Sequence, residues 1–147
     1  MTTRETAFRE LERTEIEEML ERHAFGRLAF TFHNRVDIEP IGYVYHDGWI
    51  YGRTAPGTKL TVLAHHPWVA FEIDEVNGPL SWRSVVVKGT IYFLESGGNA
   101  ANQASFDEAV RIIRRLTPEA FTDRDRTPER TTLFRLHVDE YLGRAAE

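Results

Sequence analysis

The sequence predicts a small α+β domain, mainly β, whose strands close into a barrel. Polar and apolar residues alternate over several short stretches, and turn residues such as Asp47-Gly48 join neighbouring stretches as hairpins. Fewer segments have apolar residues at helical spacing. We therefore expect about six strands with two or three peripheral helices. Because the strands follow one another as adjacent hairpins, a parallel dinucleotide-binding unit is not expected.

Composition narrows the class of protein. The 147 residues are most simply one domain spanning 1–147, with residues 1–13 as a flexible tail. A net charge of −5 argues against a nucleic-acid partner, since polyanion binding needs a basic face. The absence of cysteine excludes disulfides, thiolate metal sites and a cysteine nucleophile. No apolar run approaches membrane-spanning length and the N-terminus does not resemble a signal peptide, so we expect a cytoplasmic protein that does not bind membranes.

The first helix is expected to begin at the capping-box pattern of Thr14 to Glu17. Ile16, Met19 and Leu20 follow at helical spacing, and Gly26 is expected to end the helix. Glutamates cluster in this helix, but acidic side chains near a helix N-terminus are favoured by its dipole. We therefore predict a solvated face and no metal site.

The first two strands are predicted from alternation. Arg27 to His33 alternates, and Val36 to Ile38 pairs back after a turn at Asn34-Arg35. Pro40 cannot donate to the ladder and requires an edge, a bulge or a break. Gly42 lacks a side chain, so either a planar ligand approaches the backbone there or the glycine only relieves crowding.

The segment after the Asp47-Gly48 hairpin has the groups of an anion site. Trp49, Tyr51 and Arg53 share one face of the strand that enters it. A helix is expected over Leu60 to Ala64. Cations, hydroxyls and free N–H groups at a helix start are what a phosphate monoester needs. The candidate residues are Arg53, Thr54, Gly57, Thr58 and Lys59.

The second half of the chain is predicted to supply the remaining strands and a further helix. Trp82 and Ser84 share one face at the polar end of a central strand, where the tryptophan either serves a ligand or plugs the barrel mouth. Arg135 and His137 share a strand face that either contacts a substrate or is simply half exposed. The expected strands are Trp68 to Ile73, Ser81 to Phe93 and Thr132 to Val138. The helix is expected to begin at Ser105 to Glu108. The expected loops are Asp74 to Pro79, Ser96 to Ala104 and Thr122 to Arg130, the last of them mobile.

The order of several short motifs resembles the pyridoxamine-5′-phosphate-oxidase-like FMN-binding split barrels. The resemblance runs from about Thr14 to Gly143 and is strongest to the small flavin-nucleotide-binding, nitroimidazole-resistance-like branch. The motifs are Gly26-Arg27-Leu28-Ala29, then Pro40 and Tyr43, Ile50-Tyr51-Gly52 with Gly57-x-Lys59, His66-Pro67-x-Val69-x-Phe71, and Trp82-x-Ser84-Val85-x-Val87-x-Gly89.

This resemblance implies a six-stranded split β-barrel that forms a homodimer with FMN sites at the subunit interface. It further implies an FMN-dependent oxidoreductase of small molecules, with a nicotinamide electron donor and no catalytic side chain or metal. Carried over by position, Arg53, Thr54, Thr58 and Lys59 would hold the phosphate, the Ile41-Gly42-Tyr43 backbone would border the isoalloxazine, and Trp82, Arg83 and Ser84 would line the site, partly across the dimer.

Other functions remain open from the sequence. A second set of cations for a pyridoxal-type phosphate is not evident, so pyridoxamine-phosphate oxidase activity is the weaker enzyme hypothesis. A non-catalytic flavin or haem carrier is an alternative, with His65 or His66 as the haem ligand. A deazaflavin coenzyme in place of FMN is another.

Overall fold

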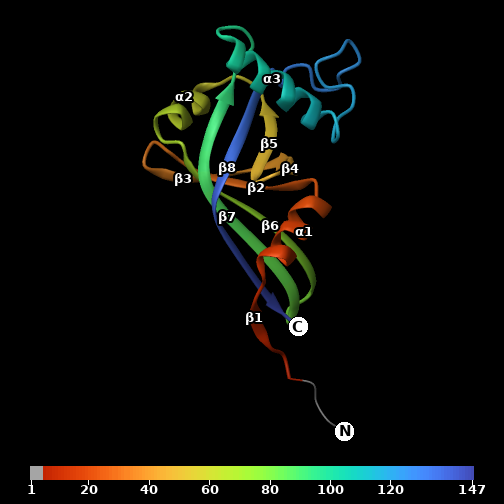
Figure 1. Cartoon of the computed structure of the whole chain (residues 1–147). Helices are drawn as coiled ribbons and strands as arrows, with labels where there is room; N and C mark the ends of the chain where they lie inside the picture. The colour runs from red at the N-terminus through yellow and green to blue at the C-terminus, as the bar shows by residue number, and fades with distance from the viewer. Residues whose placement is uncertain (1–4) are drawn as a thin grey trace.

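The computed structural model describes residues 5–147, apart from the side chain of Thr58. Helices interrupt runs of strands along the chain (Figure 1). The strands are β1 Phe8–Glu10, β2 Phe25–Phe32, β3 Arg35–Gly42, β4 Val44–His46, β5 Trp49–Thr54, β6 Trp68–Gly78, β7 Ser81–Leu94 and β8 Thr132–Ala146, and the helices are α1 Arg13–Arg22, α2 Thr58–His65 and α3 Ala100–Ile113.

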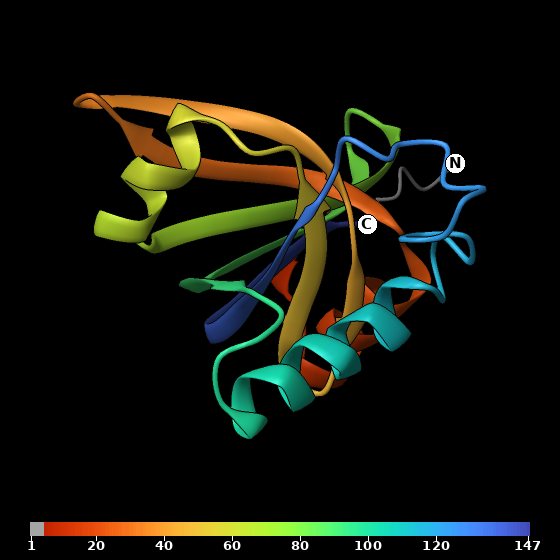
Figure 2. The ribbon, with the colours of Figure 1, turned by 90° about the horizontal axis from the view of Figure 1, so that it is seen from above.

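All strands belong to one antiparallel sheet. The order is β3-β2-β6-β7-β8-β5-β4, and β1 adds to β8. Strands β7 and β8 pair along nearly their whole length, from Trp82 opposite Ala146 to Leu94 opposite Leu133. Figure 2 shows that the sheet is strongly curled, so that β3 approaches β5 from the other end of the strand order. The result is a β-barrel that is only partly closed.

The two faces of the sheet carry separate apolar clusters. On β8, Phe134 and Leu136 pack inside the barrel, whereas Leu133 packs outside against α3. This follows from the two-residue period of a strand. The inner cluster includes Leu28, Phe30, Phe71, Val85, Val87, Phe134 and Leu136, and the outer one Tyr51, Ala109, Ile112, Ile113 and Leu133.

Several predicted elements are confirmed. Asp47 and Gly48 form the predicted hairpin turn, with φ of 50° and 82°. Pro40 is tolerated because β3 lies at the edge of the sheet. The second helix is present as α2, and the strand predicted from Ser81 is the central strand β7.

The first part of the chain differs from the sequence-based expectation. Phe8–Glu10 lies within the stretch expected to be a tail but forms β1 on the edge of β8; residues 1–4 lie outside the described part of the chain. Helix α1 begins earlier than expected, because Glu12 caps it through a capping box with Glu15. It ends at Arg22. Gly26 instead lies in β2, where a Cβ atom would overlap the ring of Phe71.

Later elements are longer than expected. Strand β6 continues to Gly78, through most of the predicted loop, because its pairing with β7 continues. Helix α3 begins at Ala100 because Asn99 accepts a hydrogen bond from the Asn102 N–H, so an asparagine cap precedes the predicted start. Strand β8 runs past Val138 to Ala146.

Gly89 provides a test of the central strand pair. A Cβ atom at this position would collide with the backbone oxygen of His137 on β8, at the register irregularity between Lys88 and Gly89. Because backbone cannot yield as a side chain does, Gly89→Ala should lower the free energy of unfolding by about 1–3 kcal/mol. Urea denaturation measures this change. In Gly78→Ala, the matched control, the added Cβ has no neighbour within 4 Å, so a loss as large as that of Gly89→Ala would contradict the explanation.

Candidate functional site

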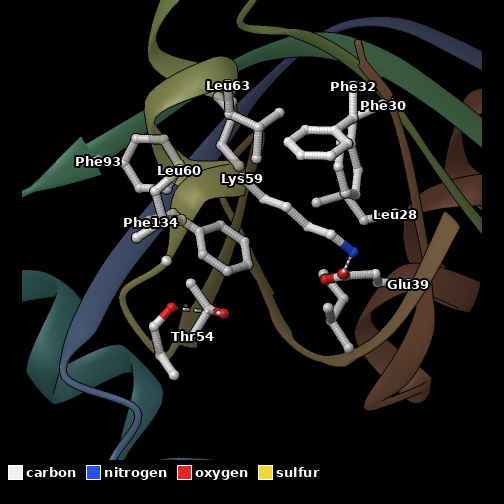
Figure 3. A pocket seen from close by; sticks show the side chains of 14 residues that line it. Leu28, Phe30, Phe32, Glu39, Thr54, Lys59, Leu60, Leu63, Phe93 and Phe134 are labelled. Atoms are coloured by element: carbon white, nitrogen blue, oxygen red, sulfur yellow. Dashed lines mark hydrogen bonds and ion pairs between the residues drawn. The ribbon is translucent and has the colours of Figure 1, made fainter. Parts of the chain in front are cut away.

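A cavity of about 390 Å³ opens where α2 meets the barrel (Figure 3). Its walls are mostly apolar and come from β2, α2, β7 and β8. Its polar side chains are Glu39, Thr54 and Lys59, from β3, the end of β5 and the first turn of α2. The apolar lining includes Leu28, Phe30, Phe32, Leu63, Ile91, Phe93 and Phe134. An aromatic body with one charged end fits such a cavity.

Lys59 is the cation of this cavity. Its Nζ lies 2.8 Å from Asp37 Oδ2 and 2.5 Å from Glu39 Oε1, and 5.8 Å from the centre of the Phe30 ring. The hydrogen bonds to Asp37 and Glu39 raise the pKa of Lys59, and the same ammonium lowers the pKa of Asp37. The raised pKa keeps the ammonium charged, and the two ion pairs fix its direction. The Lys59 side chain is still 43% exposed, so the ammonium stays open to a ligand.

The turn before α2 is open to a ligand. Gly57 precedes the helix and accepts a hydrogen bond from the Leu60 N–H at 3.1 Å. A Cβ atom at Gly57 would meet nothing within 4 Å, although Gly57 and Thr54 both line the cavity. The backbone at a helix start offers N–H groups without intrahelical partners. Thr58 begins α2, and its side chain lies outside the described part of the structure.

Arg53 is placed differently from the other candidate phosphate ligands. Its guanidinium donates to both carboxylate oxygens of Asp125, at 2.6 and 2.7 Å, and to Thr127 Oγ1 at 2.8 Å. The Arg53 and Asp125 side chains are only 6% and 3% exposed. The ion pair holds the pKa of Asp125 well below its usual range. Arg53 therefore anchors the connection between α3 and β8, expected to be mobile, and does not line the cavity.

The three residues predicted to border the isoalloxazine, Ile41, Gly42 and Tyr43, do not all lie at the cavity. Ile41 lines the cavity. Gly42 lies where a Cβ would come 3.2 Å from Leu116 Cδ2, which favours relief of crowding over the approach of a ligand. Tyr43 is 1% exposed, and its hydroxyl donates to the Leu20 carbonyl at 2.8 Å. Of these three residues, Ile41 alone lines the cavity beside Lys59.

Trp82, Arg83 and Ser84 lie elsewhere on the same chain. Trp82 and Ser84 line a second cavity of about 560 Å³ along the outer side of β7 and β8. Arg83 donates to Glu147 Oε1 at 2.9 and 2.7 Å. Among the described residues, the linings of the two cavities share no member. A single chain thus does not bring these three residues together with Lys59.

Sequence reasoning missed Asp37 and Glu39. The two-residue period places both on one face of β3, and this signal was present in the sequence. Their partner Lys59 lies about twenty positions further on, and sequence alone could not show that it would face them.

Residues 5–147 show no sign of a metal site or of a membrane-spanning helix. No group of three or more histidine or acidic side chains in this range is arranged to hold a metal ion. None of the helices there is long and apolar enough to cross a membrane. His65 and His66, the candidate haem ligands, are exposed at the end of α2 and do not line the cavity.

Known proteins resemble this chain in sequence and in backbone. A family model described as pyridoxamine 5′-phosphate oxidase matches residues 12–145. An FAD-binding protein from Mesorhizobium loti is 25% identical, with a TM-score of 0.75, over 95% of this chain and 99% of that one. An FAD-binding protein from Mycobacterium smegmatis is 27% identical, with a TM-score of 0.67, over 93% of this chain and 99% of that one. No curated protein has significant similarity to the sequence.

A third solved structure shares the fold at lower identity. It is a candidate 5-nitroimidazole antibiotic resistance protein from Bacteroides thetaiotaomicron, 17% identical, with a TM-score of 0.70 over 97% of this chain and 90% of that one. These comparisons confirm the predicted split-barrel fold and the predicted family. The described chain has more strands than the six or so expected, and β1 lies in the stretch that was expected to be a tail.

The Arg53–Asp125 ion pair gives a pH-dependent prediction. Asp125→Asn should lower the melting temperature at pH 7 by about 5–10 °C, because it leaves Arg53 buried without a counter-charge. The pKa of Asp125 is lowered in the folded state, so the carboxylate stabilises the fold above its unfolded pKa of about 4 and this contribution is lost as the pH falls further.

Thermal unfolding from pH 7 down to pH 2 measures the effect. The difference between the wild type and Asp125→Asn should shrink below about pH 4. Asp123→Asn changes an exposed carboxylate in the same connection and serves as the control. A difference between wild type and Asp125→Asn that did not depend on pH would count against the assignment.

Proposed function

Because this chain belongs to the pyridoxamine 5′-phosphate oxidase family, we propose that it binds a flavin nucleotide, FMN, in the cavity beside Lys59. The observation that carries the proposal is one fixed cation at the mouth of an aromatic-lined cavity, next to the start of a helix. The FAD-binding names of the relatives from Mesorhizobium loti and Mycobacterium smegmatis support a flavin. FMN is our choice because the site offers one cation for one phosphate.

The residues present fit a phosphate-bearing flavin. Lys59, the open backbone at Gly57 and the Thr54 hydroxyl would hold the phosphate. Thr58 is proposed from its position in the sequence alone. The apolar walls, including Phe30 and Phe134, would pack on the cofactor and exclude water. Arg53 would act indirectly, by holding the α3–β8 connection in place.

Asp37 and Glu39 set a condition on this binding. Both carboxylates already pair with Lys59, so an incoming phosphate must share the ammonium with them. The negative carboxylates of Asp37 and Glu39 would repel a phosphate, whereas hydroxyl groups of a ligand could donate hydrogen bonds to the carboxylate oxygens. The site would therefore bind an anion more weakly than a lone lysine in the same place would.

A bound flavin supplies hydride or electron transfer, and the protein supplies orientation and a dry environment. We propose an FMN-dependent oxidoreductase acting on small molecules, with a nicotinamide as electron donor. No side chain is proposed to be catalytic. Oxidation of NADH or NADPH by the flavin-loaded protein, followed at 340 nm, tests for turnover; an inert loaded protein would favour the carrier function.

Assembly into a homodimer is part of the proposal. The cavity beside Lys59 lacks Trp82, Arg83 and Ser84, which the family resemblance places at the flavin. Apolar side chains such as Trp68 and Leu142 are 54% and 49% exposed in the single chain. A second copy could cover them and bring its Trp82 and Ser84 to the first copy's Lys59.

Lys59 is tested by flavin titration. Lys59→Ala should weaken FMN binding about tenfold, a moderate loss because the ammonium is partly exposed and screened by solvent. Glu39→Gln should instead strengthen binding a few-fold, because it removes a carboxylate that competes for Lys59. Arg124→Ala, which removes an exposed cation outside both cavities, is the control. The spectrum of the purified protein and mass spectrometry of the released ligand identify the cofactor.

Unchanged affinity in Lys59→Ala would refute the phosphate assignment. If the ligand released from the purified protein is a haem or a deazaflavin, that ligand replaces FMN in the proposal. Its affinity for the Lys59→Ala and Glu39→Gln variants then tests whether it binds in this cavity.

Subunit sharing is tested by complementation. Light scattering should give twice the monomer mass, and both Lys59→Ala and Trp82→Ala homodimers should bind FMN weakly. Mixed dimers of the two variants should then regain one wild-type site per dimer. Failure to regain any site would mean that Lys59 and Trp82 do not act across an interface.

A further inference from the structure

A third cavity lies on the outer face of the sheet, under the start of α3. It measures about 430 Å³ and is distinct from the proposed flavin site, although Phe93 lines both. Trp49, Tyr92 and Arg135 line it from β5, β7 and β8, and Ser105 of α3 closes the other side. The pairing register places Tyr92 directly opposite Arg135. Neighbouring strands at fixed register therefore build one wall of this cavity, and residues 95–98, between β7 and α3, line another part.

Arg135 is held in the cavity by aromatic side chains. Its guanidinium carbon lies 4.0 Å from the centre of the Trp49 ring. The Trp49 and His137 rings pack edge to face, with their centres 4.9 Å apart. Tyr51 of β5 lies directly opposite Arg135 of β8 in the strand register. Burial raises the pKa of Tyr51, and the guanidinium of Arg135 opposes that rise. A guanidinium stacked on tryptophan is fixed in orientation.

Arg135 lacks a counter-charge within the described residues. Its Nε is the one buried side-chain nitrogen or oxygen there without a hydrogen-bond partner. No carboxylate of residues 5–147 forms an ion pair with it, and Glu95, which also lines the cavity, is exposed at the rim. A buried donor left unpaired is costly, and other arginines of the chain avoid this cost, as Arg53 does with Asp125.

From this geometry we propose that the cavity lined by Arg135 and Trp49 is a binding site for a small aromatic carboxylate. The carboxylate would accept from the guanidinium in a two-point contact, and Ser105 could add a hydroxyl donor. Trp49 and Tyr92 would pack on the ring. A monoanion suits the site better than a dianion, because one cation is present and Glu95 is negative.

Isothermal titration of the protein with benzoate tests the site, with neutral benzamide as the matched probe. Benzoate should bind saturably and at least tenfold more tightly than benzamide. Arg135→Met keeps the side-chain stem but removes the charge, and it should weaken benzoate binding at least tenfold. Arg124→Met removes an exposed arginine outside the cavity and should leave binding unchanged.

The result can be separated from the flavin proposal. Benzoate binding should persist in Lys59→Ala, because Lys59 lines the other cavity. The comparison of benzoate with benzamide needs no variant, so it stands even if Arg135→Met unfolds. Absence of saturable benzoate binding, equal affinity for the two probes, or unchanged binding in a folded Arg135→Met would each overturn the proposal.

Discussion

The pairing of β7 with β8 is the constraint on which the rest of the molecule depends. Its register places Phe93 opposite Phe134 and Tyr92 opposite Arg135. The first pair lines the cavity inside the barrel, and the second lies under α3. Because the side chains of a strand alternate, a slip of one residue would exchange the two faces and destroy both cavities at once. The bulge at Gly89 keeps this register through close backbone contact with His137.

Arg53 and Lys59, the two cations at the ends of one seven-residue segment, differ in burial and in pairing. Arg53 is buried and satisfied by Asp125, so its charge serves the fold. Lys59 is paired with Asp37 and Glu39 but stays partly exposed, so its charge can be shared with a ligand. The same pairing that holds Lys59 in place lowers its attraction for an anion. Orientation and affinity are therefore opposed at this lysine, and the carboxylates of β3 set the balance between them.

The sequence predicted what depends on neighbouring residues. Strand alternation, the Asp47-Gly48 turn and the presence of α2 follow from local patterns and were predicted correctly, although α2 begins at Thr58, before the expected Leu60. Pairings between distant residues could not be predicted in this way. Arg53 meets Asp125 across 72 positions, and β1 joins β8 across nearly the whole chain. The seven-residue segment from Arg53 to Lys59 looked like a single cradle, but the strand directs Arg53 out of the cavity that Lys59 lines.

Phe93 is a wall common to two spaces on opposite sides of the sheet. Its ring packs with the inner cluster, so a single layer of strand separates the cavity inside the barrel from the cavity under α3. A ligand that shifts β7 at Phe93 from one side would change the shape of the cavity on the other side. By thermodynamic reciprocity, the effect of the first ligand on the binding of the second would then equal the effect of the second on the first.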